Sequence, residues 1–377
     1  MKTINIGVIG CGFMGKTHTF GYKTIPLYYD NLPFKINLKT ICASHIENAK
    51  NACEMYGYEN YTDNFMDIIN DDEIDVVDIC TPNAFHKDAV LEAMKKKKHI
   101  YCDKPLAINY NDAKEIADIE KNYESITQMT FQNRFFPATM LAKKMIDEGK
   151  LGNILTFGAK FLHSGSVDKD KTITWKNDEK IGGGGVILDL GSHVFDIIRF
   201  LIGDYKSIYC KTKVLYDKRP DKNGRMVDIT NEDEAFVLCD MMCGAGGNMT
   251  ISKIATGTND ELSFEIYGDK GALRFDLMDA NYLYYFDNTQ KEDVFGGERG
   301  FKRIECVQRF EKPAGTFPSS KSSIGWLRGH VHCLYNFLNA VYEGKKTTPS
   351  FCDGAYINYI MDLAYKSAKE NKEVYCD

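Results

Sequence analysis

Two side chains with complementary chemistry, Asp189 and His193, lie four residues apart in the apolar run VILDLGSHVFDIIRFLIG at 186–203. The spacing of the apolar residues predicts a helix, and residues four apart lie on one face of a helix. A carboxylate in that place can orient an imidazole and stabilise its protonated form, and an imidazole accepts protons near neutral pH. Taken alone, such a pair is more often an ordinary hydrogen bond at a surface or between domains.

Lys104 follows the apolar stretch HIYCDKP at 99–105, which predicts a buried parallel strand. Ligands bind beyond the carboxyl ends of the strands in parallel sheets. An ammonium group there can donate to a substrate hydroxyl and stabilise a developing alkoxide, while His193 removes the hydroxyl proton. This set of residues suits oxidation of a secondary alcohol. Taken alone, Lys104 is more often a solvated lysine.

The stretch GVIGCGFMGKTH at 7–18 contains the pattern GxGxxG between an apolar strand and a predicted helix. In that context the glycines allow a tight turn, close approach of a pyrophosphate, and helix–strand packing. The alternative is a glycine turn without a ligand. We predict a dinucleotide loop, with Lys16 and His18 at the helix surface or in a domain cleft. The predicted cofactor contacts in this loop are Gly10, Gly12, Phe13, Met14 and Gly15.

The residue after the second strand usually decides between NAD and NADP, because a carboxylate there binds the ribose hydroxyls of NAD. Here that position holds Ser44, followed by His45. Neither residue repels a 2′-phosphate and both can donate hydrogen bonds to one, which favours NADP slightly. No arginine is present to settle the choice, and both may be ordinary loop residues, so NAD and NADP both stay open.

Strand and helix patterns alternate through the first third of the chain, which predicts βαβ units and an open, doubly wound parallel sheet. We read the aromatic segment at 22–36 as a loop inserted between the first helix and the second strand. The predicted strands are 4–9, 37–43, 74–81, 99–105 and 126–134, and the helices between them are 45–57, 86–98 and 111–122.

From about residue 152 the strands become longer and often alternate apolar with polar residues, as in an antiparallel sheet with one covered face. We therefore predict an N-terminal Rossmann domain at 1–130 and a C-terminal α+β domain at 131–377 with a large, predominantly antiparallel sheet. The predicted strands are 153–165, 207–217, 233–242, 247–257 and 261–277, and the helices are 186–203, 325–342 and 353–370.

Composition excludes several classes of protein. The formal net charge is −6, so no overall field attracts nucleic acid or an anionic membrane. We find no signal peptide and no apolar run near the ~20 residues needed to span a membrane. The twelve cysteines form no CxxC pair, which suggests reduced thiols in a cytoplasmic enzyme without a structural metal.

Four motifs in this order carry a family resemblance: the glycine loop, Thr81-Pro82-Asn83 with His86, Asp103-Lys104-Pro105, and GGGGVILDLGSHVFD at 182–196. Together they resemble the glucose–fructose oxidoreductase / inositol dehydrogenase (Gfo/Idh/MocA) family, and segments at 132–138, 266–276 and 350–371 extend the resemblance over essentially the whole chain. One departure is Asp103, where the family usually has glutamate. The shorter carboxylate leaves its contacts in doubt but not the role of Lys104.

The resemblance implies a site made by both domains. It assigns His193 as the base, Asp189 as its partner, and Lys104 as a contact of both alcohol and cofactor. Further implied cofactor contacts are Thr81, Pro82, Asn83, His86, Asp103 and Asn133. Arg134, His163 and Trp175 are candidate substrate contacts, although Arg134 could be an interdomain ion pair and Trp175 could be packing. The glycines at 182–185 fit either a ligand approach or a flexible loop.

The resulting prediction is an NAD(P)-dependent oxidoreductase acting on a secondary hydroxyl of a sugar, cyclitol, anhydrosugar or glycoside. One alternative is a redox-neutral sugar enzyme that eliminates or epimerises through a transient keto sugar on tightly bound cofactor. A less favoured one is a non-catalytic dinucleotide sensor. The resemblance also implies a homodimer or homotetramer formed through the C-terminal sheet.

Overall fold

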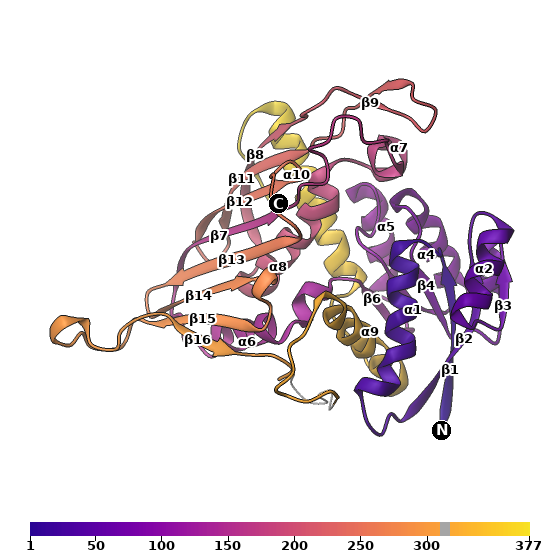
Figure 1. Cartoon of the computed structure of the whole chain (residues 1–377), viewed down its shortest axis with the longest axis horizontal. Coiled ribbons are helices and arrows are strands. Elements are labelled where there is room, and N and C mark those ends of the chain that lie inside the picture. The colour runs from indigo at the N-terminus through magenta and orange to yellow at the C-terminus, as the bar shows by residue number, and fades with distance from the viewer. Residues whose placement is uncertain (310–316) are drawn as a thin grey trace. The chain divides into compact units, whose positions relative to one another are not determined.

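The structure, a computed structural model, describes residues 1–309 and 317–377 of the chain. Its described residues form two compact units. The first contains residues 1–135, 317–319 and 325–358, and the second contains 136–309, 320–324 and 359–377. Figure 1 labels the elements of both units.

The first unit is built on a six-stranded parallel sheet with the order β3-β2-β1-β4-β5-β6. This is the doubly wound order, in which successive strands are added first on one side of β1 and then, from β4 on, on its other side. The carboxyl ends of these two central strands are where such sheets bind ligands. The strands are β1 Lys2–Ile9, β2 Phe34–Cys42, β3 Asn60–Thr62, β4 Val76–Ile79, β5 His99–Cys102 and β6 Thr127–Met129.

The helices of the first unit confirm the alternation read from the sequence. They are α1 Phe13–Tyr28, α2 Ile46–Tyr56, α3 Phe65–Asn70, α4 His86–Lys95, α5 Tyr110–Glu120, α9 Trp326–Glu343 and the first part of α10 Phe351–Glu370, with short 3₁₀ turns η1 Asn83–Phe85 and η2 Gln132–Phe135. The short strand β3 and the helix α3 were not predicted.

The aromatic segment at 22–36 is not an inserted loop, so that prediction was wrong. Helix α1 continues to Tyr28 with Pro26 in its last turn, and β2 begins at Phe34. Tyr22, Ile25, Tyr29 and Phe34 are buried in the core. A proline near the end of a helix removes only one intrahelical donor, and the apolar surface buried by these side chains favours the helix.

Helix α9 belongs to the first unit, although its residues lie far along the chain in the segment that we assigned to the second domain. Its buried face shares one hydrophobic cluster with the sheet and α1, including Val331, Leu334 and Leu338 with Ile6 and Tyr22. The ring of Tyr335 stacks on that of Tyr29, with centroids 3.7 Å apart. Periodicity revealed this helix, but only packing reveals which sheet it covers.

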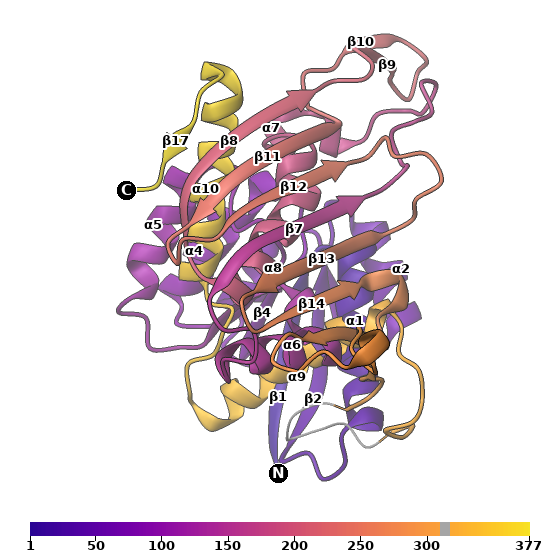
Figure 2. The same cartoon turned by 90° about the vertical axis from the view of Figure 1, so that its left-hand side faces the viewer.

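The second unit has a nine-stranded sheet, seen face-on in Figure 2, with the order β16-β15-β14-β13-β7-β12-β11-β8-β17. All pairings are antiparallel except that of β12 with β7, which confirms a predominantly antiparallel sheet. Its strands are β7 Ile154–Leu162, β8 Tyr205–Lys213, β11 Glu234–Met241, β12 Gly246–Ser252, β13 Glu261–Gly268, β14 Gly271–Asp276, β15 Tyr282–Asp287, β16 Lys302–Glu305 and β17 Val374–Tyr375.

Helices cover one face of this sheet, and α8 lies behind it in Figure 2. Helix α8 is almost wholly buried and follows a π-helical turn, η4, so the helix predicted at 186–203 is present with an irregular start. The elements are α6 Pro137–Asp147, α7 Glu179–Gly182, η4 Ile187–Gly191, α8 Ser192–Ile202, the second part of α10, the turns η3 Trp175–Asn177, η5 Leu277–Asp279 and η6 Val294–Gly296, and a separate hairpin of β9 Lys218–Pro220 and β10 Met226–Asp228.

None of the helices in the described part of the chain combines the length and apolar character that crossing a membrane requires. All twelve cysteines are described, and each is a free thiol.

Candidate active site

The three glycines of the N-terminal loop differ in what surrounds them. Gly10 has φ +108°, and a Cβ there would lie 2.6 Å from the carbonyl oxygen of Cys80. A Cβ on Gly15 would lie 1.9 Å from the carbonyl oxygen of Gly10, whereas one on Gly12 would meet no atom within 4 Å. Close packing therefore requires Gly10 and Gly15, while Gly12 faces open space.

Gly12 is also the N-cap of α1, and no side chain caps this helix end. Helix N-termini present backbone N–H groups and the positive end of the helix dipole, which together attract anions. The loop follows β1 at the switch point of the sheet. Phe13 is largely exposed, with its ring centroid 5.8 Å from that of Trp326, and Met14 is half-buried.

The loops after β4 and β5 are joined by His86. Nδ1 of His86 lies 2.7 Å from the carbonyl oxygen of Pro105, and Nε2 lies 2.8 Å from that of Thr81. The side chain is fully buried. Because both ring nitrogens contact backbone oxygens, neither is left for a cofactor. We therefore replace the predicted cofactor contact of His86 with a role in holding the two loops together.

Lys104 lies in this joined region, directly after β5. The carboxylate of the preceding Asp103 accepts the backbone N–H of Lys104 at 2.9 Å, and the backbone N–H of Asp103 donates to Ile79 at the end of β4. The Lys104–Pro105 peptide bond is cis. Asn83 is buried at the start of η1, next to Thr81 and Pro82.

Asn133 and Arg134 lie in η2 and are both buried. A guanidinium nitrogen of Arg134 is 3.9 Å from a carboxylate oxygen of Asp353, which belongs to the same unit. Ser44 and His45 are exposed between β2 and α2.

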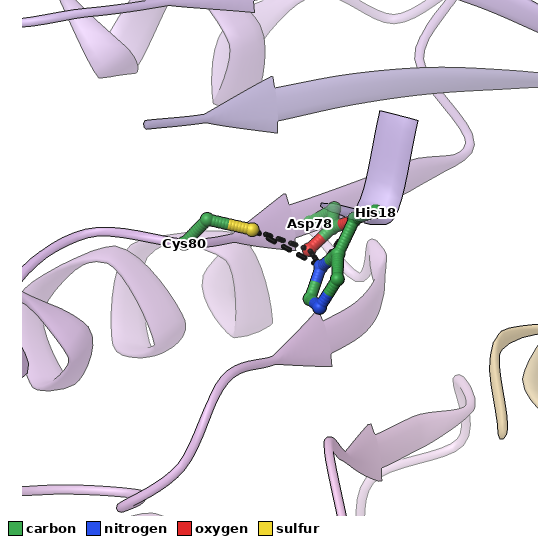
Figure 3. Close-up of side chains that lie close together, drawn as sticks. All are labelled: His18, Asp78 and Cys80. Carbon is green, nitrogen blue, oxygen red and sulfur yellow. Dashed lines mark hydrogen bonds and ion pairs between the residues drawn. The ribbon is translucent and has the colours of Figure 1, made fainter. Parts of the chain in front are cut away.

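The buried carboxylate of Asp78 in β4 contacts side chains of α1 and so connects this helix to the sheet (Figure 3). It accepts from the hydroxyl of Tyr22 at 2.9 Å and from the thiol of Cys80 at 3.3 Å. Nδ1 of His18 lies 2.9 and 3.1 Å from its two oxygens. His18 is only 1% exposed, so its predicted place at the helix surface or in a cleft was wrong.

The negative charge of Asp78 raises the pKa values of the side chains around it. Burial lowers the pKa of His18, but the charge and hydrogen bond of Asp78 outweigh burial and leave this pKa above its ordinary value. Burial and then the same carboxylate raise the pKa values of Tyr22 and Cys80 well above their usual range. Both groups therefore keep the proton that they donate.

The same atoms are a possible metal-binding set, since the donor atoms of His18, Asp78 and Cys80 lie within 4.8 Å of one another. Hydrogen bonds account for these short contacts without an ion. That the protein needs no metal stays a prediction.

In the second unit, the carboxylate of Asp189 contacts two lysines. Nζ of Lys176 lies 3.0 Å from Oδ1 and 2.9 Å from Oδ2, and Nζ of Lys253 lies 2.9 Å from Oδ2. Asp189 lies in the π-helical turn η4, and His193 follows one turn later in α8. The sequence analysis found neither lysine, because they are distant in the chain and carry no motif.

The other predicted residues of this unit are placed as follows. His193 is buried, with its ring centroid 5.9 Å from that of Phe161 in β7. Nδ1 of His163 accepts the backbone N–H of Gly165 at 2.8 Å. Trp175 is exposed at the start of η3, and the ammonium of Lys176 lies 5.8 Å from its ring centroid.

Two glycines of the run at 182–185, Gly184 and Gly185, pack closely against Tyr365 and Glu232. A Cβ on Gly184 would lie 2.2 Å from the hydroxyl of Tyr365, and one on Gly185 would lie 2.2 Å from the backbone oxygen of Glu232. The buried carboxylate of Glu232 accepts the backbone N–H groups of Gly185 and Ile187 and the hydroxyl of Tyr365. This contact fixes the start of η4 and hence the segment that carries Asp189.

Comparisons with known proteins agree with this architecture. Residues 4–131 match the oxidoreductase family with an NAD-binding Rossmann fold, and residues 139–274 match the GFO/IDH/MocA C-terminal domain. The chain is 30% identical to levoglucosan dehydrogenase of Pseudarthrobacter phenanthrenivorans, over 99% of this chain and 98% of the relative. It is 25% identical to myo-inositol 2-dehydrogenase of Thermotoga maritima, over 85% and 93% of the two chains.

Solved structures extend the likeness to three dimensions. Levoglucosan dehydrogenase in complex with NADH has a TM-score of 0.95 against this chain, with 30% sequence identity and all of both chains covered. Its complex with NADH and levoglucosan has a TM-score of 0.94 over 99% of both chains.

The His18–Asp78 pair predicts how stability depends on pH. The folded-state pKa of His18 lies above its unfolded value of about 6.5. The pair's contribution is therefore complete below that value and is lost as the pH rises through the folded-state pKa. His18→Gln should lower the free energy of unfolding by about 3–5 kcal/mol at low pH. Urea unfolding should show a smaller loss at about pH 9 than at about pH 6.

The exposed His45 offers a matched control, because His45→Gln removes a histidine without touching this pair. Its effect on unfolding should be the same at both pH values. A loss for His18→Gln that is equal at both pH values, or larger at the higher one, would contradict the proposed pairing.

Proposed function

Because the chain belongs to the Gfo/Idh/MocA family of oxidoreductases, we propose that it is a dinucleotide-dependent dehydrogenase of carbohydrate secondary hydroxyls. The substrate class that we propose is an anhydrosugar or a cyclitol, as in the relatives that act on levoglucosan and inositol. The observation that carries the proposal is the open space at Gly12, between two glycines that packing requires.

The residues present fit a dinucleotide. The backbone at Gly12 can come close to a pyrophosphate, and the uncapped N-terminus of α1 favours its negative charge. When bound, the nicotinamide supplies the hydride acceptor. The cofactor contacts that we propose are Gly10, Gly12, Phe13, Met14, Gly15, Ser44, His45, Thr81, Pro82, Asn83, Asp103, Lys104 and Asn133.

The choice between NAD and NADP rests on Ser44 and His45. Both are exposed after β2, and neither carries a carboxylate that would exclude a 2′-phosphate. The similar levoglucosan dehydrogenase structures contain NADH. We propose that this chain uses NAD and also accepts NADP.

The chemistry that we propose for the chain's own residues is proton transfer and charge stabilisation. His193 removes the proton of the reacting hydroxyl, with Asp189 as its partner. Lys104 donates a hydrogen bond to the same oxygen and stabilises its negative charge. Arg134, His163 and Trp175 are proposed substrate contacts. We place the reaction in the cytoplasm, in keeping with twelve free thiols.

We also propose that two or four copies assemble through the exposed face of the nine-stranded sheet. On β11, Phe236 and Leu238 are 49% and 58% exposed, and they pair across the sheet with Lys211 and Tyr209 of β8. Exposed apolar side chains that adjoin on one face of a sheet favour association with another surface.

The first prediction concerns cofactor binding. Gly12→Ala should leave the fold intact, because its Cβ meets no atom within 4 Å, but should weaken dinucleotide binding by about tenfold or more, or about 1.4 kcal/mol. Titration followed by protein fluorescence measures the affinity, and a thermal melt measures the fold. Gly300→Ala, also in open space, is the matched control. Unchanged affinity in Gly12→Ala would exclude this loop as the pyrophosphate site.

The second prediction concerns the base. His193→Ala should lower kcat by about 100-fold to 10,000-fold, the usual contribution of a positioned general base. The dissociation constant of the dinucleotide should not change. Steady-state kinetics on the sugar that the wild type oxidises, with parallel cofactor titrations, give both quantities. Wild-type turnover in this variant would rule out His193 as the base.

The third prediction concerns assembly. Size-exclusion chromatography with light scattering should show a dimer or tetramer at micromolar concentration. Leu238→Asp should lower the measured mass, because a charge buried in the interface would destabilise the assembly. Met55→Asp places a charge on a methionine of α2 that is 71% exposed and should leave the mass of the assembly unchanged. A wild-type monomer would refute the proposed assembly.

A further inference from the structure

The carboxylate of Asp189 is shared by two ammonium groups that come from different parts of the second unit. Lys176 lies in the turn η3, before the glycine run, and Lys253 directly follows β12. Three nitrogen–oxygen contacts of 2.9 to 3.0 Å join the three side chains. One negative charge therefore lies between two positive ones.

The two lysines differ in how firmly they are held. The backbone of Lys253 is fixed on both sides, since its N–H donates to Asp233 and its carbonyl oxygen accepts from Ser166, each at 2.8 Å. Its side chain is 18% exposed, whereas that of Lys176 is 47% exposed. A lysine on a fixed strand end loses less side-chain freedom on pairing than a solvated one, so its contact persists better.

We propose that Lys253 is a positioning residue for the reaction: its ammonium holds Asp189 ionised and in one orientation, so that Asp189 can act on His193. This inference rests on the proposed function, because it takes Asp189 as the partner of His193. Nζ of Lys253 lies 2.9 Å from Oδ2 of Asp189.

The physical reason is the position of the carboxylate at a half-buried site. Asp189 is 18% exposed, so water stabilises its charge only in part. A cation in hydrogen-bond contact favours the ionised form and restricts rotation of the carboxylate group. Without Lys253, we expect Asp189 to turn toward Lys176 alone. A displacement of about 1 Å at a catalytic group can cost about 100-fold in rate.

A double-mutant cycle tests whether Lys253 acts through Asp189. The variants are Lys253→Met, Asp189→Asn and both together, and the quantities are kcat, KM for the sugar, and the kinetic isotope effect with sugar deuterated at the oxidised carbon. Lys253→Met should lower kcat by about 10-fold to 100-fold, leave the dinucleotide affinity unchanged and raise the isotope effect. When Asp189→Asn is already present, Lys253→Met should lower kcat by less than a further factor of about two.

Three further variants complete the experiment. Lys253→Arg should restore most of the rate, because a guanidinium keeps the charge. Lys176→Met should lose less activity than Lys253→Met. Lys143→Met removes the lysine of an exposed pair with Asp147 in α6 and should leave kcat unchanged. If Lys253→Met does not fold, Lys253→Gln, which keeps a donor without the charge, takes its place.

The outcomes separate this inference from the proposed function. Wild-type activity in Asp189→Asn would contradict the role of Asp189 itself. If Asp189→Asn lowers kcat but Lys253→Met does not, the positioning role of Lys253 is overturned while the proposed function stands. The same conclusion follows if the factors by which the two single changes lower kcat multiply in the double variant. An equal or greater loss in Lys176→Met would also overturn the choice of Lys253 as the fixed contact.

Discussion

The edge of the first unit that carries the glycine loop depends on one buried carboxylate. Asp78 lies in β4 with no exposed surface and receives hydrogen bonds from Tyr22 and Cys80 while it pairs with His18 (Figure 3). Two of these partners lie on α1, the helix whose N-terminus carries the glycine loop. Leaving such a charge unpaired would cost several kcal/mol, of the order of 3–5. These contacts hold α1 against β4, and α1 carries Gly15 near its start.

The second unit also contains a buried carboxylate whose hydrogen bonds fix a neighbouring segment. Glu232 is buried and satisfied by backbone N–H groups and Tyr365, which fixes the start of η4. Asp189, which lies in η4, is 18% exposed and pairs with two lysines. Glu232 thus fixes the backbone of this segment, whereas Asp189 is, under the proposed function, the partner of the base His193. The π-helical turn η4, which carries Asp189, is the kind of irregularity that often accompanies a functional site.

The sequence was sufficient for the features that repeat or carry a motif. Apolar runs and helix periodicity predicted five strands of the parallel sheet and the main strands of the antiparallel one, and the glycine pattern predicted the turn after β1. What it missed depends on contacts between residues far apart in the chain. No local pattern in the sequence indicates that Tyr22 and Tyr29 are buried or that α9 packs on the first sheet. The same holds for the two lysines that contact Asp189. The glycines at 182–185 were visible in the sequence, but the close packing of Gly184 against Tyr365 and of Gly185 against Glu232 was not.

The central claim is that this chain oxidises a carbohydrate hydroxyl with a nicotinamide dinucleotide. The most direct test mixes the purified protein with NAD⁺ or NADP⁺ and a panel of anhydrosugars, inositols, free sugars and glycosides, and follows the absorbance of the reduced nicotinamide. The account predicts steady reduction with at least one anhydrosugar or cyclitol, faster with NAD⁺ than with NADP⁺. Binding of the dinucleotide without reduction on any member of the panel would contradict it, and would favour a redox-neutral sugar enzyme or a dinucleotide sensor instead.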